Sequence, residues 1–153
     1  MLKFTDTKVV FQEIPDHITL AINMSGCPCA CEGCHSSYLS EDIGEALTTE
    51  LIDTLLTRYA SASCISFMGG DREPAEVSRL ALHIRCKAPN MAIAWYSGRD
   101  ELSNEVKISN FDYIKIGSYQ QERGPLNAPT TNQRLYKIDR STLQFEDITK
   151  KML

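Results

Sequence analysis

Four of the six cysteines of this 153-residue chain lie in one short segment, residues 27–34. Cys27, Cys31 and Cys34 form a C-x3-C-x2-C spacing, and Cys29 stands inside the first gap. Thiolates so close together are typical ligands of zinc or of an iron–sulfur cluster. A disulfide framework is not favoured, because the first residues carry charges and show no secretory signal. The segment therefore predicts a metal or cluster site.

Two kinds of centre are compatible with these thiolates. Structural zinc takes four protein ligands, so a zinc site would need Cys29 or His35 as the fourth. A 4Fe-4S cluster held by only three cysteines leaves one iron open to an outside ligand. The first centre would be closed and structural, whereas the second could perform chemistry. The remaining cysteines, Cys64 and Cys86, stand in apolar segments, where we expect buried structural thiols.

Apolar runs alternate with amphipathic segments along the chain, which predicts an α/β fold with a mostly parallel sheet. Strands are expected at residues 8–14, 18–24, 64–68, 91–96, 113–116 and 135–139. Helices are expected at residues 49–60, capped by Thr48 or Thr49, and around 77–84, with a weaker helical stretch at 100–106. The first two strands should form a hairpin, and residues 120–132 should form a long loop.

The unusual residues follow the predicted strands. Gly69-Gly70-Asp71, Ser97-Gly98 and Gly117 each stand at a strand end, as does the cysteine segment. Since the carboxyl ends of parallel strands meet at one edge, these loops should share one site. A complete eight-fold barrel usually needs about 250 residues, so a single domain over residues 1–153 can form only a partial, open βα barrel.

The C-x3-C-x2-C spacing after an early strand, with Gly-Gly-Asp at the end of the next strand, resembles the radical S-adenosylmethionine (SAM) superfamily. Taken alone, Gly-Gly-Asp is more typical of a turn than of a binding site. The resemblance implies a partial barrel of the radical SAM type, with Cys27, Cys31 and Cys34 as ligands of a 4Fe-4S cluster. It also implies a set of residues in contact with SAM: Gly33, Cys34, His35, Gly69, Gly70, Asp71, Ser97 and Lys115.

Within the superfamily, two stretches resemble the activating proteins of anaerobic ribonucleotide reductases. They are Cys-Glu-Gly-Cys-His-Ser-Ser-Tyr-Leu at residues 31–39 and Asn132-Gln133-Arg134 near the C-terminus. The resemblance implies an activase that forms a glycyl radical on the catalytic subunit of such a reductase, with a flavodoxin- or ferredoxin-type electron donor. Asn132, Gln133 and Arg134 would then contact the partner. The chain departs from the family at residues 13–17, where a Gly-Pro-Gly and arginine element is common, and in the position of Pro74.

Other functions stay open at this stage. Two are small radical enzymes, an activase of the pyruvate formate-lyase type and a deazaguanine synthase, and one is a non-catalytic iron–sulfur or zinc module. The net charge of −4 and the pI near 5.4 disfavour nucleic acid as a partner. No apolar stretch of about 18 residues predicts a membrane span. We expect a cytoplasmic protein.

Overall fold

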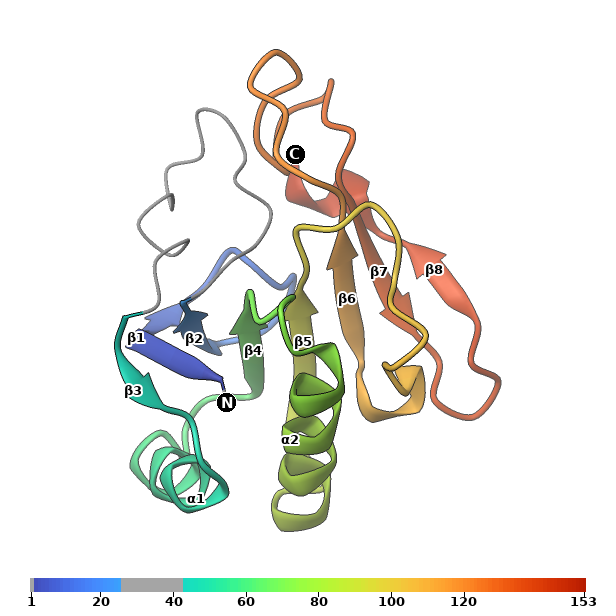
Figure 1. The fold of residues 1–153 in the computed structure, drawn as a ribbon. Coiled ribbons are helices and arrows are strands. Elements are labelled where there is room, and N and C mark those ends of the chain that lie inside the picture. The colour runs from blue at the N-terminus through green and yellow to red at the C-terminus, as the bar shows by residue number, and fades with distance from the viewer. Residues whose placement is uncertain (1, 26–42) are drawn as a thin grey trace.

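The computed structural model describes residues 2–25 and 43–153, which form one eight-stranded sheet with two α-helices on one face (Figure 1). The strand order is β3-β1-β2-β4-β5-β6-β7-β8. The strands are β1 (Lys3–Val10), β2 (Thr19–Met24), β3 (Glu45–Ala46), β4 (Cys64–Met68), β5 (Ala92–Tyr96), β6 (Tyr113–Ile116), β7 (Arg134–Ile138) and β8 (Phe145–Asp147). The helices are α1 (Thr49–Arg58) and α2 (Pro74–Lys87), with short 3-10 turns η2 (Ile108–Asn110) and η3 (Thr149–Met152).

The centre of the sheet is parallel and its flanks are antiparallel. Strands β2, β4, β5 and β6 pair in parallel, while β1 and β3 on one side and β7 and β8 on the other pair antiparallel. The predicted α/β class is confirmed, and the parallel part of the prediction holds for the four central strands. Among the described strands, β3 and β8 are edges that do not pair with each other, so the sheet is open.

The predicted hairpin is confirmed, but its first strand lies earlier than expected. β1 pairs with β2 and ends at Val10, and the chain then leaves the sheet. Residues 11–14 of the expected strand lie outside any strand, although Ile14 is fully buried. β1 is instead a polar strand near the sheet edge, which has no strong apolar pattern to reveal it.

Both predicted helices form. Thr48 is the N-cap of α1, and its hydroxyl accepts a hydrogen bond from the Leu51 amide at 3.1 Å. α2 begins at Pro74, whose fixed φ suits the first helical position. The weaker helix expected at residues 100–106 is wrong. The amides of Glu105 and Lys107 donate to the hydroxyls of Ser103 and Ser78, not to carbonyls of a helical turn.

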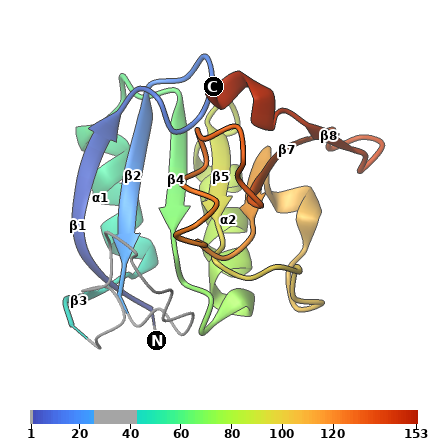
Figure 2. The same ribbon diagram turned by 90° about the horizontal axis from the view of Figure 1, so that it is seen from above.

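The two faces of the sheet are covered differently. Leu20, Phe67 and Trp95 are among the residues that form the larger core, between the sheet and the helices. On the other face a smaller core includes Ile14 and Leu126, and the connection from β6 to β7 crosses in front of the sheet there (Figure 2). The predicted long loop at 120–132 therefore packs against the sheet through Leu126, which is 9% exposed.

The two isolated cysteines have different environments. Cys64, at the start of β4, is fully buried as expected. Cys86, near the end of α2, is exposed, so the prediction of a buried thiol is wrong there. Helical geometry explains why Cys86 is exposed. Val77, Leu80 and Ile84 form the buried face of α2, and residue 86 lies on the opposite face.

Within residues 2–25 and 43–153, no helix combines the length and the apolar character needed to cross a bilayer.

Candidate functional site

The cysteine segment is attached at the carboxyl end of β2. Ser25, the residue after β2, donates from its hydroxyl to the Ile43 carbonyl at 2.5 Å, and its amide donates to the Lys3 carbonyl at 3.0 Å. The described residues that flank positions 26–42, Ser25 and Ile43, are thus joined by a hydrogen bond. The predicted ligands Cys27, Cys31 and Cys34, and the predicted contacts Gly33 and His35, lie outside the described residues. Their attachment point is at the edge where the other predicted loops converge.

The Gly69-Gly70 turn follows β4 beside that attachment point. Both glycines have positive φ, +107° and +90°, a conformation that side chains other than glycine's rarely adopt. A Cβ on Gly69 would lie 3.4 Å from the Cβ of Met24, the last residue of β2. A Cβ on Gly70 would lie 2.8 Å from Val77 Cγ2, so this position has no room for a side chain. The turn therefore lies beside the end of β2, after which the sequence continues into the cysteine segment.

Asp71 points from this turn toward the end of β5. Asp71 is only 2% exposed. Its carboxylate accepts a hydrogen bond from the Ser97 hydroxyl at 2.5 Å and one from the Gly98 amide at 2.9 Å. The guanidinium of Arg99 lies 3.5 Å from the Asp71 carbonyl oxygen. A buried carboxylate needs such donors, because water no longer solvates it. The predicted residues Asp71 and Ser97 are thus brought into direct contact.

Further hydrogen bonds link the turn after β5 to the end of β6. The Arg99 carbonyl accepts a hydrogen bond from the Gly117 amide at 2.7 Å. The carboxylate of Asp100 accepts from the amide of Ser118 at 3.0 Å and from its hydroxyl at 3.2 Å. The loops after β4, β5 and β6 are therefore connected to one another by hydrogen bonds. The sequence analysis assigned no role to Arg99, Asp100 or Ser118. Their positions just after predicted strands are the one sequence feature that could have indicated them.

Lys115 is buried on β6, with an exposed fraction of 7%. Its ammonium donates to Gln133 Oε1 at 2.7 Å and to the Gly117 carbonyl at 3.1 Å, and it lies 5.8 Å from the centre of the Tyr96 ring. The hydroxyl of Tyr96 donates to the Glu13 carbonyl. Burial raises the pKa of Tyr96, so its phenol stays protonated at neutral pH.

The three residues of the Asn-Gln-Arg element have three different environments. Gln133 is 6% exposed and holds Lys115, while the Asn132 amide donates to the Ser118 carbonyl at 3.1 Å. Arg134 is exposed, and its guanidinium lies 3.8 Å from the Asp147 carboxylate. Of the three, Arg134 is the exposed residue, whereas the buried Gln133 joins the start of β7 to Lys115 on β6.

The described residues offer no alternative ligand set for a cluster. No group of three or more His, Cys, Asp or Glu side chains that could hold a metal occurs in residues 2–25 and 43–153. Cys64 lies at the amino end of β4 and Cys86 lies on α2, both away from the edge where the loops meet. The donor set that suits a cluster is therefore the thiolates of residues 27–34.

A family model described as a 4Fe-4S single cluster domain matches residues 18–136. The match spans β2 to β7 and includes the cysteine segment, the glycine turn, Ser97, Lys115 and Gln133. The chain belongs to the 4Fe-4S single cluster domain family. No curated protein and no solved structure matches the chain.

Family membership favours iron–sulfur over zinc at the cysteine segment and supports a 4Fe-4S cluster as the centre of this domain. The thiolates of the C-x3-C-x2-C spacing suit such a cluster in kind.

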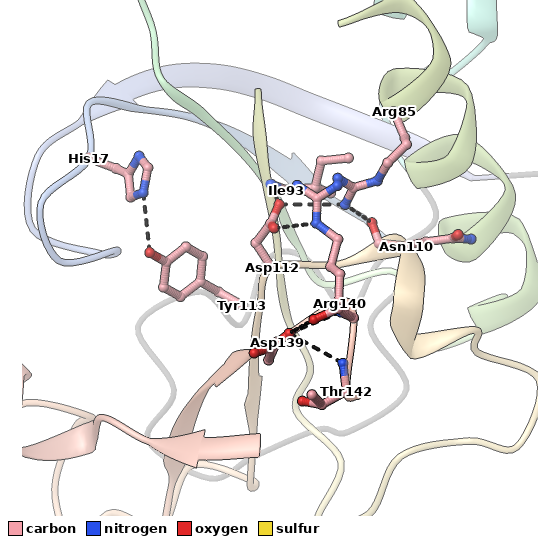
Figure 3. Close-up of polar contacts among 10 residues, drawn as sticks. His17, Arg85, Ile93, Asn110, Asp112, Tyr113, Asp139, Arg140 and Thr142 are labelled. Carbon is pink, nitrogen blue, oxygen red and sulfur yellow. Dashed lines mark hydrogen bonds and ion pairs between the residues drawn. The ribbon is translucent and has the colours of Figure 1, made fainter. Parts of the chain in front are cut away.

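A second polar group of this 4Fe-4S domain lies at the opposite edge, at the amino ends of the parallel strands (Figure 3). His17 lies 2.9 Å from the Ser63 hydroxyl through Nδ1 and 3.2 Å from the Tyr113 hydroxyl through Nε2. Asp112 accepts from Arg140 at 2.6 Å and from the Ile93 amide at 2.8 Å. These contacts join the hairpin turn, β4, β5 and β6, so we assign this edge a structural role.

Cys64 lies near the same edge, and its burial raises its pKa to about 12. Its thiol is therefore protonated at neutral pH, which makes it a poor metal ligand and a poor nucleophile.

Proposed function

We propose that this protein is a radical SAM activase that generates a glycyl radical on an anaerobic ribonucleoside-triphosphate reductase. The observation that carries the proposal is the proximity of two features in a 4Fe-4S family member. The C-x3-C-x2-C segment follows β2 in the sequence, and the Gly69-Gly70 turn lies next to Met24, the last residue of that strand. We interpret the open sheet as a partial barrel of the radical SAM type.

In this proposal Cys27, Cys31 and Cys34 would hold the cluster, and SAM would bind at the iron that has no cysteine ligand. With one electron from a flavodoxin- or ferredoxin-type donor, the cluster and SAM would supply the radical chemistry: the sulfonium C5′–S bond would break, and a hydrogen atom from the partner's glycine would end on 5′-deoxyadenosine, with methionine as the other product. The protein binds and orients these groups and excludes water.

The chain's own residues would bind SAM from two sides. Gly33, Cys34 and His35 would do so from the cysteine segment, and the backbone of the Gly69-Gly70 turn from the end of β4. A glycine backbone lets the ligand approach without obstruction by a side chain.

At the far end of this edge, Ser97 and Lys115 would complete the SAM site. Lys115 is held in place by Gln133, and an ammonium fixed in this way suits a carboxylate such as that of the methionyl group. The role of Asn132 and Gln133 toward the partner would then be indirect, through the loop that they secure, while Arg134 could contact the partner directly.

The proposed partner is a protein, the catalytic subunit of the reductase. We expect its glycyl segment to enter at the carboxyl ends of the central strands, since the described strands do not close into a barrel. We propose that the reaction takes place in the cytoplasm, where thiols stay reduced.

The test is anaerobic reconstitution of the cluster, followed by reduction with dithionite in the presence of SAM. We expect 5′-deoxyadenosine, measured by chromatography, from the wild-type protein and from Cys29→Ala, and none from Cys31→Ala. Cys86→Ala is the matched control for removal of an exposed thiol away from the site. With the reductase subunit added, an electron paramagnetic resonance signal of a glycyl radical should appear.

Other outcomes would contradict parts of the proposal. Cleavage of SAM without a radical on the reductase would favour another small radical enzyme, such as a pyruvate formate-lyase-type activase or a deazaguanine synthase. A protein that fills with zinc, or that loses its cluster on replacement of Cys29 or His35, would be a non-catalytic module with four protein ligands.

A further inference from the structure

We propose that Asp71 is a positioning residue, whose carboxylate clamps the Gly69-Gly70 turn to the turn after β5 and does not itself bind the methionyl ammonium of SAM. The inference rests on the proposed function, since it concerns how the SAM site is built. It changes the role that the resemblance alone assigns to Asp71, and it makes Ser97 the partner through which Asp71 acts.

Both carboxylate oxygens of Asp71 face β5. Oδ1 accepts from the Ser97 hydroxyl at 2.5 Å, and Oδ2 accepts from the Gly98 amide at 2.9 Å. Asp71 and Ser97 are each only 2% exposed. Donors to a charged acceptor make stronger hydrogen bonds than donors to a neutral one, so this pair is expected to stay closed when a ligand arrives.

The glycine turn needs support from outside itself. Two consecutive glycines lose much backbone entropy on folding and contribute no side chain that could hold their shape. Trp95 holds the first of them, because its indole N–H donates to the Gly69 carbonyl at 2.7 Å. The clamp by Asp71 holds the other end, so the turn is fixed at both ends by β5 and the loop that follows it.

Trp95 also makes the turn observable. It is the only tryptophan of the chain, is 2% exposed, and stacks on Phe111 with ring centres 5.8 Å apart. Its bond to the Gly69 carbonyl places the indole directly on the turn. A change in the turn should therefore alter the tryptophan emission of the full-length chain without any ligand or cluster.

The experiment is a double-mutant cycle with Ser97→Ala, Asp71→Asn and the variant that carries both substitutions. We expect each single substitution to weaken SAM binding to the cluster-loaded protein about tenfold, the size of one lost charge-assisted hydrogen bond. The double variant should bind SAM no more weakly than the weaker-binding single variant, since the effects of substitutions at coupled residues do not add. Melting temperature and tryptophan emission of the full-length chain should shift in the same non-additive way.

Asp139→Asn is the matched control. Asp139 makes a similar contact, accepting from the Ser141 hydroxyl at 2.7 Å and the Ser141 amide at 2.9 Å, but it follows β7 at the opposite edge. This substitution should leave SAM affinity and tryptophan emission unchanged.

The proposal is refuted if Asp71→Asn weakens SAM binding equally in the presence and absence of the Ser97 hydroxyl, with unchanged emission. Asp71 would then contact the ligand directly. If the wild-type protein binds no SAM, the proposed function fails. The coupling of Asp71 to Ser97 is then tested by tryptophan emission and melting temperature alone, which should respond non-additively to the two substitutions.

Discussion

Replacement of Gly117 by alanine should destabilise the protein through the joint between β6 and β7. Gly117 has a φ of +106°, and a Cβ added there would lie 2.9 Å from the Cα and 3.3 Å from the Cγ of Gln133. The nearer contact is a backbone atom, so it cannot move without shifting the residue that leads into β7. The same shift would draw Gln133 away from Lys115.

Two costs add in this variant. An alanine held at such a φ costs about 1–2 kcal/mol. An inserted methyl group that forces a backbone shift costs about 1–3 kcal/mol more. We therefore expect a loss of about 2–5 kcal/mol in the free energy of unfolding, a large share of the about 5–15 kcal/mol typical of a domain.

Gly69→Ala separates the two costs. Gly69 has an almost identical φ of +107°, but the nearest atom to its added Cβ would be Met24 Cβ at 3.4 Å, an ordinary contact. It should show the conformational cost alone. Urea unfolding of the full-length chain, followed by circular dichroism and by Trp95 fluorescence, measures both variants, and the midpoint of Gly117→Ala should fall by about 1 M or more.

The reasoning would be wrong if the two variants lost the same stability within about 0.5 kcal/mol, which is the usual scatter for independent sites. Overlap with Gln133 would then carry no cost, and the joint between β6 and β7 would be looser than the contacts indicate.

Two further predictions concern the opposite edge and the isolated thiols. His17→Ala should lower the free energy of unfolding by about 1–3 kcal/mol, because it removes the hydrogen bonds to Ser63 and Tyr113. Tyr113→Phe removes only one of these bonds and should lower the free energy of unfolding less, as measured by urea titration. Equal losses in the two variants would show that the bond to Ser63 contributes nothing. At pH 8 an alkylating reagent should label Cys86, which is exposed, and not Cys64, whose burial raises its pKa to about 12. Peptide mass mapping of the folded chain checks this, and labelling of Cys64 at a similar rate would show that its segment opens.

Local patterns predicted the elements of this fold well. Helix α1 and the strands β4, β5 and β6 all lie where periodicity and turn residues predict them, and the N-cap is Thr48, one of the two threonines that the sequence offers. The edge at which the loops converge also followed from the alternation of strands and helices, because parallel strands direct all their carboxyl ends the same way. Spacing alone likewise singled out the cysteines, since ligands of one centre must be close in space.

The sequence by itself therefore determined the class of fold, the thiolates available to a cluster and the neighbourhood of the site. Only the tertiary structure decided which way the side chains at that site turn. Asp71 faces Ser97, 26 positions away, and Lys115 faces Gln133, 18 positions away. No local pattern encodes such pairs, because a buried charge turns toward whichever donor or acceptor the packed sheet brings within reach.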